Sequence, residues 1–226
     1  MEMNTVQKFV LLAQHPTKGR FITPSSNLDC AIIGAILLEF SFREILDLEK
    51  DRLIMKKEGI YSDPMFSKVS ELLNCGAKPK RIRYWINKLS GHSKDFKKMI
   101  LNDFAKKNLI KILDSKFLGI FPYQKHFLVA HHVRNDLIQQ LKINILFHHA
   151  LNRENFGVLG LVQACNMHKI FSSNKNELKV IKKSLKELLE ESPITAAVDN
   201  TIKEIQAAIV GGVAASTVAV SAGGSN

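Results

Sequence analysis

The sequence predicts a mainly α protein, with a single-domain helical bundle core, peripheral amphipathic helices and one or two small β-hairpins. Three observations carry this prediction. Apolar residues recur at helical spacing along most of the chain. The segment 28–46 is almost wholly apolar, as expected of a helix buried at the centre of a domain. Only 6 Pro and 12 Gly occur among 226 residues, a length sufficient for one sizeable core.

The first elements are two helices joined by a loop. An amphipathic helix opens the chain and places four apolar residues on one side, namely Val6, Phe9, Val10 and Leu12. The loop at 15–26 is rich in Pro, Gly and Ser and has room for a short hairpin. Because charged Glu39 interrupts the apolar segment 28–46, we interpret it as the central core helix and not as a membrane span.

Turn and capping residues divide the middle of the chain. Alternating apolar and polar residues around Glu49-Lys50-Asp51 predict a short hairpin. Asp63-Pro64 is typical of a helix start, and Gly76 of the stop that ends this helix. Another helix is expected to end at Gly91, and the next to begin near Ser93, which can cap it.

The remaining segments predict one hairpin and several helices. Segment 109–129, rich in Phe and Ile, is expected to form two strands and a loop. Asn135-Asp136 is expected to open a long helix. An apolar helix over 156–171 and an amphipathic helix over 176–192 follow, and a last helix is expected to start near Ala197.

Positive charge is concentrated in one part of the sequence. The 32 Lys and Arg outnumber the 21 Asp and Glu, and such a surplus favours phosphate-rich partners. The segment 76–107 holds ten Lys or Arg and only two acidic residues. Lys94, Lys97 and Lys98 are spaced so that they share one helical face near a helix start, which predicts a phosphate-binding site. The alternative is an ordinary solvated face, and Tyr84 and Trp85 are expected to be core residues.

A second hypothesis concerns the order of elements between Arg81 and Val129. Two helices followed by an aromatic hairpin is also the order found in a winged-helix DNA-binding domain. In that alternative the protein is a DNA-binding regulator that uses the basic segment 78–107. A DNA-binding wing usually carries Lys or Arg at its tip, whereas this tip carries Pro122, Tyr123 and Gln124 beside the single Lys125. Nucleic acid is therefore the less favoured partner.

The sequence lacks the motifs of an enzyme or a metal site. It contains no HExxH, no Walker or Rossmann phosphate loop and no GxSxG motif. Cys30, Cys75 and Cys165 are scattered and include no CxxC, which fits a reducing cytoplasm. The adjacent pair His148-His149 has poor ligand spacing on a helix. We expect no enzymatic activity, no cofactor, no metal and no catalytic residue.

Several segments resemble the Golgi phosphoprotein 3 family. They read LLAQHPTKGRF, GAILLEFSFREIL, YWINKLSG and FAKKNLIKILDSKFLGIF, and the resemblance extends from Val6 to Ala215. It rests on their order and on fixed positions such as Gly34, Glu39 and Trp85-Ile86. It implies a single domain over 1–215 followed by a flexible tail over 216–226. The chain looks closer to bacterial relatives than to eukaryotic, Golgi-associated ones.

The resemblance also implies a function. Eukaryotic members of the family bind phosphatidylinositol 4-phosphate through a basic pocket and act as adaptors for the cytoplasmic tails of glycosyltransferases. Two arginines of that pocket fall on Lys94 and Lys97, its tryptophan on Pro24 and a third arginine on Ile33. Because a planar ring and a guanidinium fork are lost, selectivity for one phosphate is weakened more than the attraction to anions.

These arguments predict a cytoplasmic, peripheral membrane protein that lies on the cytoplasmic face of a membrane. Its expected partners are anionic membrane lipids, the cytoplasmic tails of membrane proteins and a second copy of the chain. Lipid headgroups are expected to meet six cations: Lys94, Lys97, Lys98, Arg81, Arg83 and Arg20. A hairpin over 117–128 is expected to touch the membrane or another subunit through Phe117, Leu118, Ile120, Phe121, Tyr123 and Phe127.

Overall fold

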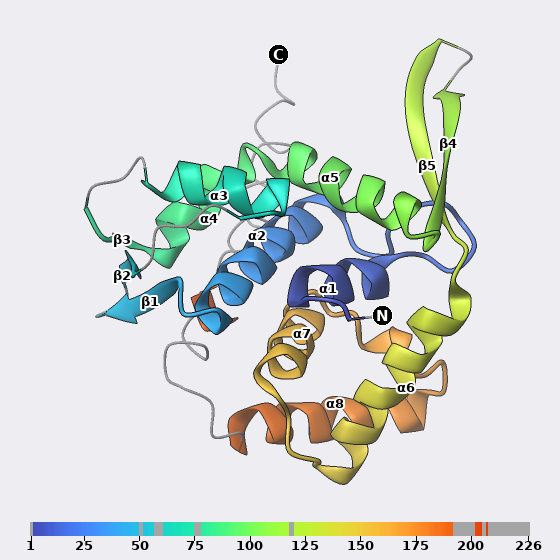
Figure 1. Cartoon of the computed structure of the whole chain (residues 1–226). Coiled ribbons are helices and arrows are strands. Elements are labelled where there is room, and N and C mark those ends of the chain that lie inside the picture. The colour runs from blue at the N-terminus through green and yellow to red at the C-terminus, as the bar shows by residue number, and fades with distance from the viewer. Residues whose placement is uncertain are drawn as a thin grey trace, which may run out of the picture.

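Helices dominate the computed structural model of the chain, which describes residues 2–49, 52–56, 61–74, 78–117, 120–191, 202–204 and 207 (Figure 1). The helices are α1 (Thr5–Ala13), α2 (Ser25–Phe42), α3 (Pro64–Asn74), α4 (Ile82–Ser90), α5 (Ser93–Lys106), α6 (His131–Phe147), α7 (Arg153–Ala164), α8 (Lys175–Glu191) and a 3₁₀ helix at His168–Ile170. The strands are β1 (Leu46–Glu49), β2 (Arg52–Met55), β3 (Lys80–Arg81), β4 (Ile110–Phe117) and β5 (Phe121–Leu128). The mainly α class predicted from the sequence is confirmed.

Helix α2 lies at the centre of the fold and touches α1, α4, α5 and α7 (Figure 1). Its residues from Ala31 to Phe40 are all buried, so no face of this part of the helix is left to water. By length and composition α2 could cross a membrane, but 61% of it is buried inside the fold. Its interpretation as the central core helix is confirmed.

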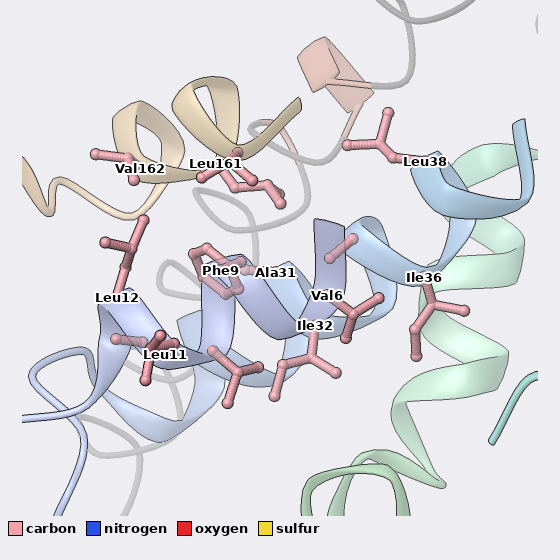
Figure 2. Packing of buried hydrophobic residues seen from close by; sticks show 14 of the residues in the cluster. Val6, Phe9, Leu11, Leu12, Ala31, Ile32, Ile36, Leu38, Leu161 and Val162 are labelled. Carbon is pink, nitrogen blue, oxygen red and sulfur yellow. The ribbon is translucent and has the colours of Figure 1, made fainter. Parts of the chain in front are cut away.

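The hydrophobic core forms one cluster that joins α2 to its neighbours. Figure 2 shows Phe9 of α1, Ala31 of α2 and Leu161 of α7 gathered in the same part of this core, and all three are fully buried. A buried phenylalanine contributes about 1.5–3 kcal/mol through the apolar surface that it removes from water. Burial of this kind fixes the position of α2, whose start borders the candidate site.

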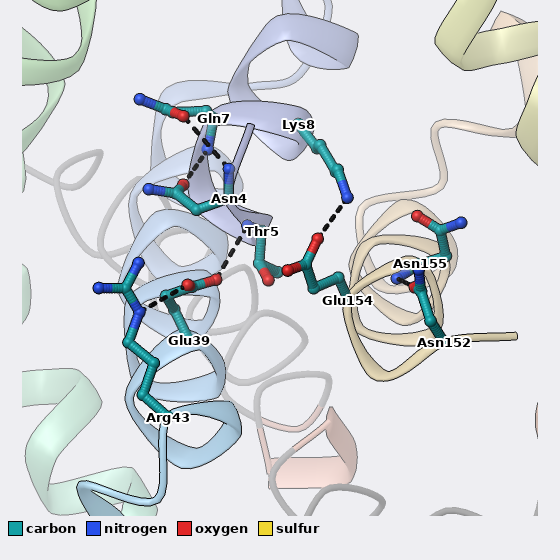
Figure 3. Close-up of polar contacts among 9 residues, drawn as sticks. All are labelled: Asn4, Thr5, Gln7, Lys8, Glu39, Arg43, Asn152, Glu154 and Asn155. Carbon is teal, nitrogen blue, oxygen red and sulfur yellow. Dashed lines mark hydrogen bonds and ion pairs between the residues drawn. The ribbon is translucent and has the colours of Figure 1, made fainter. Parts of the chain in front are cut away.

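Polar groups fix the angle between α1 and α2. The buried carboxylate of Glu39 accepts a hydrogen bond from the Thr5 backbone N–H at 3.0 Å and from Arg43 Nε at 2.8 Å (Figure 3). Asn4 caps α1 and exchanges reciprocal hydrogen bonds with Gln7. An ion pair between Lys8 and Glu154 joins α1 to α7 (Figure 3).

Two small antiparallel sheets lie at different places on the helical body. Strands β1, β2 and β3 form a three-stranded sheet in that order. Strands β4 and β5 form a separate hairpin, with Ile110 opposite Leu128 at its base and Phe117 opposite Phe121 near its tip. Figure 1 shows this hairpin projecting from the body beyond the end of α5, on the side away from β1, β2 and β3. The short hairpin predicted around Glu49-Lys50-Asp51 and the two strands predicted over 109–129 are confirmed. The bounds 117–128 expected for the membrane-contacting hairpin are too short, because its first strand already begins at Ile110.

Some predicted boundaries differ from the structure. Helix α6 begins at His131 and not at Asn135-Asp136, because Arg134 is buried in its first turn and donates a hydrogen bond to the Leu12 carbonyl oxygen at 3.0 Å. Ser93 is a buried first residue of α5 and not its cap, which is His92.

Two other predicted segments are shorter than expected. The apolar helix predicted over 156–171 stops at Ala164, since Asn166 turns the backbone with a φ of 52°. The hairpin expected in the loop 15–26 reduces to one antiparallel bridge between Gln14 and Phe21. Gly76, Ala197 and the tail 216–226 lie outside the described residues.

Candidate anion-binding site

Helix α5 presents the three predicted lysines beside the core. Phe96, Ile100 and Phe104 recur every four residues and are buried, so they fix the rotation of the helix about its axis. This rotation leaves Lys94 and Lys98 exposed and Lys97 about 18% exposed. The three ammonium groups therefore lie on one side of α5, as the spacing predicts.

The hairpin provides the opposite wall of the site. Between it and α5 lies a groove of about 370 Å³ whose lining side chains come from the loop before α2, from α5 and from both strands: Phe21, Lys94, Lys97, Lys98, Leu101, Asn102, Ile112, Gln124 and His126. All three predicted lysines line it, together with the apolar side chains of Phe21, Leu101 and Ile112. The side-chain amide of Gln124 donates a hydrogen bond to Asp114 Oδ1 at 3.0 Å, which fixes it on the hairpin.

The loop before α2 holds the base of the hairpin in place. Gly19 has a φ of 59°, a left-handed conformation, and a Cβ at this position would lie 2.9 Å from the ring of Phe127. The Gly19 carbonyl oxygen accepts a hydrogen bond from the His126 backbone N–H at 3.0 Å. Phe21 packs against the His126 ring in a tilted arrangement, with centroids 4.4 Å apart and an angle of 43° between the rings. Glycine is therefore required where the loop passes under the hairpin.

His126 adds a titratable group to the groove. Its Nδ1 lies 2.7 Å from the Oε1 of buried Gln14, a contact in which the ring nitrogen donates. Burial lowers the pKa of His126, a backbone hydrogen bond raises it, and the nearby Lys97 ammonium lowers it further. The ring is therefore neutral at pH 7, and the lysines supply the positive charge of the groove.

The start of α2 meets the lysines at the edge of the groove. Lys97 Nζ lies 2.6 Å from Asp29 Oδ1 and 3.4 Å from Ser25 Oγ. Pro24 is the residue before the first turn of α2 and offers no side-chain cap. Ile33, the position onto which the resemblance places a third pocket arginine, is fully buried, so a side chain there does not reach an anion at the surface.

The structure separates the arginines from the lysines. Arg81 lies in β3 directly opposite Arg52 of β2, and Arg83 is exposed on the first turn of α4. Figure 1 places β3 and the hairpin on opposite sides of the molecule, and neither arginine lines the groove. Arg20 is exposed in the loop that supports the hairpin, next to the groove but outside its lining.

The hairpin carries exposed apolar side chains beyond the groove. Ile120 is 75% exposed, Phe121 61% and Tyr123 43%. Phe127 is only half-exposed, because it covers Gly19 at the base of the hairpin. The Phe117 side chain and Leu118 lie outside what the structure describes. Sequence reasoning missed Leu113, which is 41% exposed on the same hairpin.

Three other features of the described residues do not favour anion binding or catalysis. A cavity of about 420 Å³ between α1, α3 and α5 is lined by the carboxylates of Asp63 and Asp103 and by the single cation Lys106, so its charge does not favour anions. Within the described ranges, no group of three or more His, Cys, Asp or Glu could hold a metal ion. Burial raises the pKa of Cys165 to about 12, so its thiol stays protonated and is a poor nucleophile.

Tyr84 and Trp85 differ in their surroundings. Trp85 is buried, as predicted for a core residue, whereas Tyr84 is 46% exposed, so the same prediction for Tyr84 is wrong. The amphipathic helix α4 turns these consecutive side chains about 100° apart, and only one of them can face α2.

The helical body, the central apolar helix and a groove lined by three lysines beside a projecting hairpin define a mainly helical protein with a basic groove on its surface. A family model described as Golgi phosphoprotein 3 matches residues 6–205, so the chain belongs to the Golgi phosphoprotein 3 family, and the resemblance seen in the sequence is confirmed. A comparison with curated proteins gave no match.

Proposed function

We propose that the protein is a non-enzymatic, peripheral membrane protein that binds phosphate headgroups of anionic lipids in the groove between α5 and the hairpin. The observation that carries the proposal is the convergence of three lysines on this groove, which is also walled by Gln124 and His126. Lys94 and Lys98 form no ion pair with any other described residue, so their charge is available to a ligand. Each cation near an anionic surface adds about 1 kcal/mol to membrane attachment.

The hairpin supports attachment to a membrane and not only to a soluble anion. Ile120 and Phe121 are large apolar groups at a projecting tip, where water contact is unfavourable. With the lysines against the headgroups, shallow insertion of this tip would remove the apolar groups from water. The same tip could alternatively pair with a second copy of the chain, which would raise the number of attachment points for each assembly.

Membership of the Golgi phosphoprotein 3 family favours an adaptor role on the cytoplasmic face of a membrane. The partners in this proposal are anionic lipids, with phosphatidylinositol 4-phosphate as the family ligand, and the cytoplasmic tails of membrane proteins. Lysine replaces the forked guanidinium at Lys94 and Lys97, so we expect a preference for anionic vesicles that depends weakly on which phosphate they carry.

A charge-reversal variant tests the proposal. Lys94→Glu/Lys98→Glu is expected to lower binding to vesicles of phosphatidylcholine with phosphatidylglycerol by at least about 30-fold, because two cations that each contribute about 1 kcal/mol are lost and two negative charges are added at the membrane surface. Lys97 is left intact in this variant because it already holds Asp29. Co-sedimentation with vesicles measures the effect, and vesicles containing phosphatidylinositol 4-phosphate measure selectivity.

The matched control is Lys183→Glu/Lys186→Glu, which makes the same change of charge on α8. It is expected to retain most of the binding, because α8 lies on the far side of the body from α5 (Figure 1). Equal losses in the two variants would show that net charge alone attracts the protein. No binding to any vesicle, together with salt-sensitive binding to duplex DNA, would favour the winged-helix alternative.

A further inference from the structure

Asp29 is a carboxylate at the edge of the groove, paired with Lys97, one of the three lysines that line it. It belongs to the second turn of α2, and its Oδ1 lies 2.6 Å from Nζ of Lys97. Both side chains are mostly covered, with 23% of Asp29 and 18% of Lys97 exposed. Within the described part of the chain no group donates a well-directed hydrogen bond to this buried oxygen, so the ion pair is its stabilising contact.

We propose that Asp29 is an intramolecular competitor for the groove: an anionic headgroup reaches the Lys97 ammonium only by displacing this carboxylate. The inference rests on the proposed anion binding in the groove and adds the residue that limits its affinity. Lys94 and Lys98 lack such a partner among the described residues, so the competition concerns one of the three cations.

The chemistry of the pair explains why displacement weakens binding. Two like charges about 4 Å apart repel each other even in water and several times more strongly near a protein surface, which lowers binding by at least about 5-fold. A phosphate beside Lys97 would meet this repulsion from Asp29, and it would also leave the partly buried carboxylate without its counter-ion. Both effects disappear when the side chain is neutral.

Two substitutions break the same ion pair and separate competition from structure. Asp29→Asn keeps the size of the side chain and removes its charge. It is expected to raise binding to phosphatidylcholine–phosphatidylglycerol vesicles by about 5- to 10-fold, which is the lower part of the effect expected from repulsion between the carboxylate and a phosphate. Lys97→Gln removes the same contact together with the cation, and it is expected to lower binding by about 5-fold. If the ion pair served only to hold the groove in shape, both variants would bind less.

A third variant controls for net charge. Glu190→Gln adds the same single positive charge as Asp29→Asn, but on an exposed part of α8. It is expected to change vesicle binding by less than about 2-fold, since the added charge lies away from the bilayer. Melting curves check that each variant is folded.

The outcomes distinguish this inference from the proposed function. Stronger binding by Asp29→Asn, with little change in Glu190→Gln, supports the competitor. If the wild-type chain binds anionic vesicles and Asp29→Asn binds them equally well or more weakly, the competitor role of Asp29 is overturned. The proposed function would then remain intact. If the wild-type chain and every variant failed to bind anionic vesicles, the proposed function would be overturned and the inference with it.

Discussion

Replacing Ile120 and Phe121 together by aspartate is expected to weaken attachment to anionic vesicles by at least about 100-fold. Each of these side chains is more than half exposed at the hairpin tip, and burying one in the bilayer contributes about 1.5–3 kcal/mol. Aspartate removes this contribution and adds repulsion from the anionic surface. The melting temperature should stay unchanged, because neither side chain packs in the core.

The control for this prediction is Ile143→Asp/Phe147→Asp on α6. These side chains are also apolar and exposed, by 46% and 69%, but they belong to the last turns of α6, whose first residue and not whose last follows the hairpin. The control is expected to bind vesicles almost as the wild type does. Equal losses in both variants would contradict insertion of the hairpin. Sedimentation velocity of the hairpin variant shows whether the same residues also join two copies of the chain.

The largest expected effect on stability comes from replacing Glu39 by alanine. We expect the free energy of unfolding to fall by about 3 kcal/mol, the lower end of the range for breaking a buried ion pair. The Glu39 side chain is 5% exposed and holds the Thr5 backbone N–H at the start of α1. Its other partner, Arg43, is 43% exposed and lies over the Phe66 ring, so it can return to water. Because Arg43 can be solvated again, we expect the loss of stability to lie near the lower end of the range for buried ion pairs.

A second ion pair with the same spacing serves as the control. Lys183 and Glu187 are also four residues apart, but they lie on an exposed part of α8 with the lysine 79% exposed. Glu187→Ala is expected to change stability by less than about 0.5 kcal/mol, as for other surface pairs. Urea unfolding followed by circular dichroism measures both variants. Similar midpoints for the two would contradict the role of Glu39 in fixing α1 on α2.

The sequence could predict those parts of the site that depend on local spacing. The i, i+3, i+4 pattern of Lys94, Lys97 and Lys98 places them on one face of α5 wherever that helix lies. The spacing does not predict which part of the chain lies opposite this face of α5. The opposite wall of the groove, with Gln124 and His126, is formed by the hairpin, which follows α5 in the sequence. Contacts between distant parts of a chain are set by packing of the whole core.

Proximity in sequence was misleading for the arginines. Arg81 and Arg83 precede Lys94 by about a dozen residues, yet they belong to β3 and the first turn of α4, on the other side of the molecule from the hairpin toward which α5 leads. Asp29 is the opposite case, because it is distant from Lys97 in the sequence but contacts it in the structure. It appears in the sequence only as the polar start of an apolar segment, and its pairing with Lys97 depends on how α2 packs against α5.

The central claim, that the groove between α5 and the hairpin is the anion-binding site, is tested most directly by an NMR titration that resolves the backbone amides. The probe is glycerophosphoinositol 4-phosphate, a soluble headgroup without acyl chains. The largest shifts are expected at Lys94, Lys97, Lys98, Gln124 and His126, with smaller ones at the start of α2. Shifts confined to Arg52, Arg81 and Arg83, or no shifts at all, would contradict the claim.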